Sequence, residues 1–194
     1  KIIRHSIDNC QIEQNQGGGI RIWSTGENGP QIQLSNLRLI NNGVELLNLT
    51  GPPVIDLRLT NTKHVGVMNC YIAGIKGPGI KARLYASQVS HGSLFNITNN
   101  VIVHTKFGSA IWVEGNQFNI LQILRNYISR NFCEQRELIK ISGVLAQPFS
   151  HNLIYSNQAS TILSSVTDEN LSSGSLFESN GFYRNIALNH TVSA

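Results

Sequence analysis

The sequence predicts an all-β protein that folds as a right-handed parallel β-helix, a β-solenoid of about seven coils. Three observations predict it: a degenerate repeat of about 26 residues, short segments of alternating apolar and polar residues, and an unusual composition. The 194 residues include 23 Ile and 22 Asn but only 8 Ala. Ile favours strands, whereas Ala is the best helix former. Charged residues make up 13% of the chain, against roughly 25% in an average globular domain.

The repeat is anchored on four Asn residues, Asn100, Asn126, Asn152 and Asn180, at intervals of 26, 26 and 28 residues. An apolar residue stands three places before and two places after each anchor. Asn tolerates the left-handed backbone of a sharp corner, and stacked Asn amides bond one another. We therefore expect these four residues to form a structural corner ladder. The frame continues upstream with anchors at Cys10, Ser35 and Cys70, and a second Asn follows three of the Asn anchors at positions 131, 157 and 185.

A third row of apolar segments follows about ten to thirteen residues after each anchor. The segments alternate apolar and polar residues, as strands with one buried face do. No repeat contains an amphipathic helix of ten residues, so each repeat is predicted to hold about three short strands. Parallel stacking of such repeats gives a solenoid, whereas a propeller blade needs about 40 residues. The segments are Gly19–Ile22, Leu46–Leu49, Gly79–Lys81, Ala110–Val113, Leu138–Ile141 and Thr161–Leu163.

Loops and one extra strand are expected to interrupt the coils. Residues 23–30 and 164–175 are rich in turn-forming and polar residues, and Ile55–Leu59 is predicted to be an additional strand after the break at Gly51-Pro52-Pro53. No interdomain linker is evident, so residues 1–194 are predicted to form a single β-helix module. Because the chain starts at Lys1 and not at Met, we expect it to be a fragment of a larger extracellular protein.

The three cysteines do not form a metal or redox motif, because no CxxC pair exists. Cys10 and Cys70 share the corner position of two coils and are expected to be small, inward-facing free thiols. They lie two coils apart, which is too far for a disulfide. Cys133 is expected in a loop, as an exposed thiol or as a partner for another chain.

Four sequons point to an extracellular protein that is secreted or anchored in a membrane elsewhere in its chain. The candidate glycosylation sites are Asn48, Asn96, Asn170 and Asn189, each followed by a Thr or Ser two places on. The net charge of +4 is spread along the chain without a basic run, so we expect no nucleic acid partner. No apolar run is long enough to span a membrane, and we expect no membrane contact by this segment.

Catalysis is not expected, although β-helices often act on acidic polysaccharides. Hydrolysis needs paired carboxylates, and elimination needs clustered ones that hold calcium. Asp8, Asp56 and Asp168 fall in different coils, and Glu114 with Glu137 is the one pair that could be neighbours across coils. We predict no catalytic residues, no metal site and no cofactor. An alternative function is glycan binding by a surface of exposed aromatic rings. The candidate residues are Trp23, Tyr85, Trp112 and Tyr127.

Five phrases of the repeat carry a family resemblance. They are Gly19–Ser24, Cys70–Gly74, Ala110–Gly115, Arg125–Ser129 and Asn180–Asn185. They resemble the β-helix segments of the bark beetle/Anakonda family, very large insect transmembrane proteins of tricellular junctions. The resemblance implies a non-catalytic extracellular module with a structural and adhesive role. Its partners would be other extracellular proteins or copies of the parent protein, with glycans as a further class. The alternative is a carbohydrate-active β-helix enzyme or a glycan-binding module.

Overall fold

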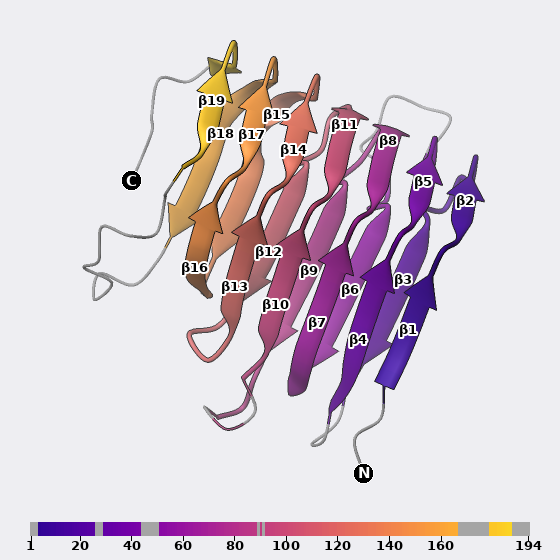
Figure 1. The fold of residues 1–194 in the computed structure, drawn as a ribbon, viewed down its shortest axis with the longest axis vertical. Coiled ribbons are helices and arrows are strands. Elements are labelled where there is room, and N and C mark those ends of the chain that lie inside the picture. Colours follow the sequence, from indigo (N-terminus) through magenta and orange to yellow (C-terminus); the bar gives the residue numbers. More distant parts are fainter. Residues whose placement is uncertain are drawn as a thin grey trace.

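A computed structural model describes residues 4–25, 29–43, 51–88, 90, 92–166 and 179–187. Within these residues twenty strands form three parallel sheets, A, B and C. The chain passes through the three sheets in turn, so each strand pairs with its equivalent in the coil before and the coil after. Figure 1 shows sheets A and B in front and sheet C behind them, with the coils advancing from the N-terminal coil on the right to the last coil on the left.

The strand bounds follow the order of the coils. Sheet A contains β1 (Arg4–Asp8), β4 (Gly29–Ser35), β7 (Thr62–Met68), β10 (Leu94–Thr98), β13 (Ile120–Leu124) and β16 (Leu145–Ser150). Sheet B contains β2 (Gln11–Glu13), β5 (Arg38–Ile40), β8 (Tyr71–Ile75), β11 (Val101–Thr105), β14 (Tyr127–Ser129), β17 (Leu153–Tyr155) and β19 (Gly181–Tyr183). Sheet C contains β3 (Ile20–Ser24), β6 (Ile55–Thr60), β9 (Ile80–Tyr85), β12 (Ile111–Gly115), β15 (Phe132–Ser142), β18 (Gln158–Val166) and β20 (Ile186–Ala187).

The architecture is the predicted all-β, right-handed parallel β-helix. The coils wind in the right-handed sense that parallel crossovers adopt. Six coils contribute a strand to every sheet, and the seventh has strands in sheets B and C only among the described residues. The number of complete coils is therefore slightly smaller than the expected seven.

The second coil differs from the sequence interpretation in two places. Ile55–Thr60 is not an extra strand, because it pairs with β3 and β9 as the second strand of sheet C. The third-row segment expected at Leu46–Leu49 lies outside the described residues. The anchor of this coil is Leu37 and not Ser35, since Arg38 pairs with Gln11 on one side and with Tyr71 on the other.

The core consists of rows of apolar side chains that stack from coil to coil inside the three sheets. In sheet A, Leu34, Val67, Ile97 and Ile123 stand in register and are at most 1% exposed. Neighbouring strands lie about 4.8 Å apart, so each side chain packs on its equivalents above and below. Burial of one such side chain contributes roughly 1.5–3 kcal/mol, and this explains the abundance of Ile.

A single residue with left-handed backbone turns every corner between sheets A and B, with φ between 52° and 57°. It comes directly before the ladder position, so the left-handed residue and the ladder residue are neighbours. The sequence interpretation had given both roles to the same Asn. The left-handed residues are Asn9, Asn36, Asn69, Asn99, Arg125, His151 and Ser179.

The ladder residues at this corner are joined through their amides. The Oδ1 of Asn126 accepts hydrogen bonds from the backbone N and the Nδ2 of Asn100, at 2.9 and 3.0 Å. Asn126 donates from the same two groups to Oδ1 of Asn152, and its Nδ2 also donates to the carbonyl of Ile97 at 2.9 Å. Asn152 repeats the pattern with Asn180. Each amide thus satisfies backbone groups that a solenoid corner would otherwise bury without a partner.

A second ladder stands at the corner between sheets B and C. Asn131 donates from N and Nδ2 to Oδ1 of Asn157, which donates in the same way to Asn185. In the second coil the equivalent residue is Asn42, five places after Leu37, and its Oδ1 accepts from Nδ2 of Asn15 at 2.9 Å. Here too the residue before each ladder position has a positive φ.

All three cysteines are free thiols in the structure. The expectation of an inward thiol is right for Cys70, which is buried, and wrong for Cys10, which is exposed in the first described coil. The expectation of an exposed loop thiol at Cys133 is also wrong. Residues 132–142 form β15, and Cys133 is fully buried, with Sγ 2.9 Å from the carbonyl oxygen of Gly108.

Cys133 makes the stability of the fold sensitive to alkaline pH. Burial raises the pKa of its thiol from 9.0 to about 11. Because the pKa is higher in the folded state, the neutral thiol stabilises the fold below pH 9, and this contribution is lost between about pH 9 and 11. Two pKa units correspond to about 2–3 kcal/mol. Urea unfolding at pH 8 and pH 11 should show a decrease larger by about this amount in the wild type than in Cys133→Ala. An equal decrease in the two proteins would contradict the expectation.

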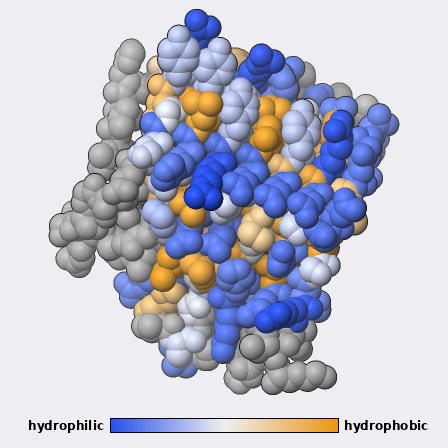
Figure 2. Space-filling model, in the orientation of Figure 1, coloured by the Kyte–Doolittle hydropathy of each residue, from blue (hydrophilic) through white to orange (hydrophobic). Residues whose placement is uncertain are grey.

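The face formed by sheets A and B is predominantly hydrophilic. Figure 2 shows hydrophobic residues on it in small separate groups between polar side chains. The described residues include no helix of the length and apolarity that a membrane span requires. A different surface, formed by charged and aromatic side chains, lies on the opposite side of the molecule, on the outer face of sheet C.

Candidate functional site

The outer face of sheet C carries two rows of charged and aromatic side chains, because alternate residues of each strand point away from the core. We call these nine residues the basic–aromatic face. Five of them are basic and two are acidic, so this face has an excess of positive charge. The first row is Arg21, Asp56, Lys81, Trp112 and Lys140, paired in register from β3 to β15. The second row, two residues further along the strands, is Trp23, Arg58, Arg83 and Glu114.

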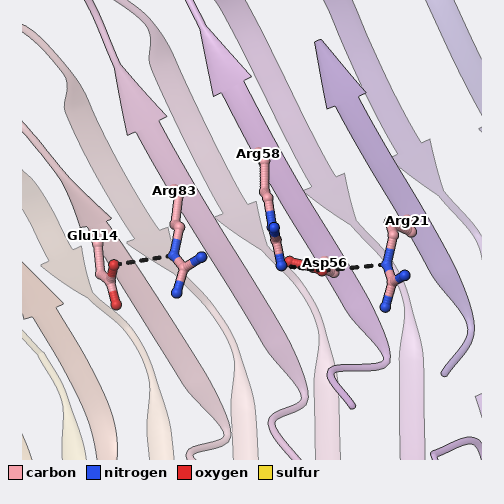
Figure 3. A network of polar contacts seen from close by, with 5 residues as sticks. All are labelled: Arg21, Asp56, Arg58, Arg83 and Glu114. Atoms are coloured by element: carbon pink, nitrogen blue, oxygen red, sulfur yellow. Dashed lines mark hydrogen bonds and ion pairs between the residues drawn. The ribbon is translucent and has the colours of Figure 1, made fainter. Parts of the chain in front are cut away.

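Both carboxylates of the face are held by arginines, as Figure 3 shows. Asp56 lies between Arg21 and Arg58, with its Oδ2 at 3.4 Å from Nε of the first and 3.6 Å from Nη2 of the second. The Asp56 side chain is only 4% exposed. Glu114 accepts a hydrogen bond from Nε of Arg83 at 3.2 Å. Both carboxylates of the face are therefore occupied in ion pairs with arginines.

The two tryptophans lie against cations of their own or a neighbouring strand. The guanidinium groups of Arg21 and Arg58 are 5.5 and 4.7 Å from the ring centroid of Trp23. The Nζ of Lys81 lies 3.6 Å from the ring centroid of Trp112, and that of Lys140 lies 5.4 Å from it on the strand that follows. Such cation–π contacts contribute about 0.5–1 kcal/mol at exposed sites and more where water is excluded. They fix the indole of Trp112 between two ammonium groups.

Lys81 and Arg136 differ in ion pairing from the other cations near Trp112. Within the part of the chain that the structure describes, neither Lys81 nor Arg136 forms an ion pair, whereas Lys140 is paired with Glu137 at 3.2 Å. Burial, followed by the charge of Arg83, lowers the pKa of Lys81. The negative charges of Glu114 and Asp56 act against this lowering, so Lys81 interacts with carboxylates of the neighbouring strands without a direct ion pair to either.

A pocket of about 250 Å³ opens at these two cations. Lys81, Trp112 and Arg136 line one part of it, and Phe107, Pro53 and Pro78 are among the residues of the rest. The pocket therefore combines positive charge with aromatic and apolar walls, as sites that orient a small polar group do. It lies over β9, β12 and β15, at the end of the strands where the preceding corner enters the sheet.

The sequons and the acidic pair predicted from the sequence have the following places in the structure. Asn96 lies half-buried on β10, whereas the sequons at Asn48, Asn170 and Asn189 lie outside the described residues. Glu114 and Glu137 are not neighbours, because Glu114 pairs in register with Ser142, five residues beyond Glu137. No group of three or more His, Cys, Asp or Glu side chains that could hold a metal occurs among the residues searched, which are the described ones.

The contacts between cations and tryptophan rings on sheet C were not predicted from the sequence. The signal was present in the third-row segments, where the residue after the first Ile is Arg21, Lys81, Trp112 or Lys140. These four residues take the same position in their segments only when the segments are aligned on their apolar residues. Asp56 completes the row once Ile55–Thr60 is placed in the second coil. Arg136 and Phe107 carry no comparable signal, since they reach the pocket from a bulged strand and from a corner.

Comparison with known proteins gives one family. A family model described as the right-handed beta helix region matches residues 4–158. No curated protein and no solved structure matches the chain.

Proposed function

Because the chain belongs to the right-handed β-helix family, we propose that it is a non-catalytic module that shapes a larger extracellular protein and carries adhesive contacts on its outer faces. The observation that carries the proposal is the pairing of the carboxylates on sheet C. Asp56 is held by two arginines and Glu114 by one. Hydrolysis of a glycosidic bond uses two carboxylates that flank the bond, and each of these two is instead held by arginine.

The positions of these carboxylates support the same view. Asp56 and Glu114 stand two coils apart, which is about 9–10 Å at strand spacing, and are offset along the strands by a further two residues. Lys81 and Arg83 lie between them in the intervening coil. At the corner between sheets A and B, hydrogen bonds from Ser35 and Asn36 lower the pKa of Asp8. A lowered pKa also makes this group a poor proton donor.

The finer assignment in our proposal is a junction protein of the bark beetle/Anakonda type. It is supported by the five repeat phrases that resemble that family and by the sequons, of which Asn96 lies on the outer side of sheet A. Other extracellular proteins, or copies of the parent protein, are the partners that such a module would contact. The rigid stack of coils would hold their binding surfaces at fixed spacing.

We expect the chain to be glycosylated and to leave polysaccharides intact. Material secreted by animal cells should carry an N-glycan on at least one of Asn48, Asn96, Asn170 and Asn189, detected by mass spectrometry of peptides. Incubation with hyaluronan or polygalacturonate should release no new reducing ends and no unsaturated products. Secreted material unmodified at all four sites, or turnover of either polymer, would contradict the proposal. Turnover would support the carbohydrate-active alternative.

A further inference from the structure

The outer face of sheet B differs in composition from that of sheet C. Its first outward positions from β5 to β17 stand in register from coil to coil and are Arg38, Tyr71, Val101, Tyr127 and Leu153. We call the last four of these residues the tyrosine row. At the strand spacing of about 4.8 Å, the row covers about 14 Å along the solenoid. Most residues of the basic–aromatic face on sheet C are charged, whereas none in the tyrosine row is.

The tyrosine row is accessible to solvent although it carries no charge. Tyr71 and Leu153 at its ends are 39% and 43% exposed, and the two residues between them are half-buried. In the last two coils the rings of Tyr155 and Tyr183 extend the aromatic surface, since they stack with 5.6 Å between their centroids. Tyr and Arg are enriched in protein interfaces, whereas Lys, Glu and Asp are depleted. A connected row of exposed aromatic and aliphatic side chains is typical of a surface that binds another protein.

Cations border the tyrosine row at both corners of sheet B. Arg125 precedes β14 and Arg130 follows it, and both side chains are exposed. Lys106 follows β11 at the same corner as Arg130 and is exposed as well. Arg38 lies beside the row, with its guanidinium 5.5 Å from the ring centroid of Tyr71. None of these four cations forms an ion pair within the part of the chain that the structure describes.

Acidic side chains do not balance this charge. The described acids on sheets A and B and their shared corner are Asp8 and Glu13, and both belong to the first coil, two coils away from Tyr71. The ion pairs among the described residues all lie on sheet C. The positive charge around the tyrosine row is therefore complementary to a partner that carries acidic groups.

We propose that the tyrosine row and the cations at its borders bind an acidic segment of another protein, in which apolar side chains alternate with Asp or Glu. The apolar side chains would pack on Tyr71, Tyr127 and Leu153. The carboxylates would lie against Arg125 and Arg130 at the two corners. The inference rests on the proposed function, because it names the kind of partner for one of the adhesive contacts.

A second copy of this chain fits the surface less well than an acidic partner does. The carboxylates of Asp56, Glu114 and Glu137 are ion-paired on sheet C. That of Asp8 accepts hydrogen bonds from Ser35 and Asn36. Two sheet B faces that met would bring cations against cations, which disfavours contact. An anionic glycan would use the cations without needing the apolar side chains of the row, and this difference separates a glycan from a protein segment by experiment.

Fluorescence anisotropy of labelled probes with the full chain tests the proposal. The first peptide has three repeats of Asp-Tyr-Glu-Leu, the second replaces its acids by amides (Asn-Tyr-Gln-Leu), and the third replaces its apolar residues by serine (Asp-Ser-Glu-Ser). The first peptide should bind, and the other two should bind at least tenfold more weakly, because the contact needs both charge and apolar surface. A heparin hexasaccharide that binds as tightly as the first peptide would show that charge suffices. That result, failure of the first peptide, or equal binding of either other peptide would overturn the proposal.

Matched variants locate the contact. Tyr71→Ser should weaken binding of the first peptide by about tenfold, whereas Tyr85→Ser, which removes an exposed ring from sheet C, should leave it unchanged. Arg130→Gln should weaken binding by severalfold, and Arg136→Gln, the same change on sheet C, should not. Glutamine is compatible with the backbone at position 130, because Gln14 has the same left-handed conformation at the equivalent corner.

Unfolding and the site of binding are measured separately. The urea midpoint of each variant shows whether a loss of binding reflects a loss of folded protein. Equal losses in Tyr71→Ser and Tyr85→Ser at unchanged midpoints would overturn the proposal. Binding that is lost only in the sheet C variants would also overturn it and would leave the proposed function standing, because the adhesive contact would then lie on another face. Turnover of a polysaccharide by the chain would contradict the proposed function and leave this binding site standing.

Discussion

Replacement of Asn126 by Ala is expected to destabilise the fold by about 3–5 kcal/mol. The side chain is 2% exposed and lies in the middle of its ladder. Its loss would leave the backbone N and Nδ2 of Asn100 and the carbonyl of Ile97 without these hydrogen bonds. Each buried polar group without a partner costs about 1–3 kcal/mol. Urea unfolding followed by circular dichroism measures the difference through the midpoint at an unchanged slope.

The control lies four residues before the preceding ladder position. Asn96 is on the outer side of sheet A, and its Oδ1 is buried without a hydrogen-bond partner among the described residues. Asn96→Thr, which also favours the strand, should change the free energy of unfolding by less than about 0.5 kcal/mol. The ladder would not be the main stabilising element of the corner if Asn126→Ala cost no more than Asn96→Thr. Asn180, which ends the ladder within the described residues, should give an intermediate loss when changed to Ala.

The spacing of the Asn residues was the most informative signal in the sequence. A coil of constant length places equivalent residues above one another, so intervals of 26 residues define the register from Asn100 to Asn152 directly. The same logic failed in the second coil, where Ser35 took the place of Leu37. No Asn marks the first ladder there, and the apolar pattern fits two offsets. Asn42, which bonds Asn15, was the residue that could have decided between them.

The candidate site could be predicted only in part. Strand alternation was sufficient to place Trp112 on an outer face, and its neighbours Lys81 and Lys140 follow from the coil length. The pocket depends on corners, whose paths are not periodic. Phe107 reaches the pocket through a corner with positive φ, and Arg136 lies where β15 shifts its register against β18. Neither irregularity leaves a trace in composition or spacing.

The close stacking of the corners beside the pocket leads to the second large expected effect. Gly108 packs directly on the backbone of the coil before it, since a Cβ there would clash with the carbonyl carbon of Gly77 and with the N of Pro78. Both are backbone atoms, which cannot move without separating the coils. Gly108→Ala is therefore expected to destabilise the fold by about 3 kcal/mol, measured by urea unfolding. Gly17→Ala, where nothing lies within 4 Å of the added Cβ, should stay within about 0.5 kcal/mol.

The same contact predicts how a second change would combine with the first. A Cβ on Gly77 would meet the carbonyl of the preceding corner at Gly51, so Gly77→Ala forces apart the coils on the other side. Substitutions in direct contact do not add independently. Once Gly108→Ala has displaced the corner, Gly77 has room to shift, and the double variant should lose less than the sum of the single losses. Full additivity would mean that each corner relaxes alone, and a small loss in Gly108→Ala would mean that the coils are not held together at this point.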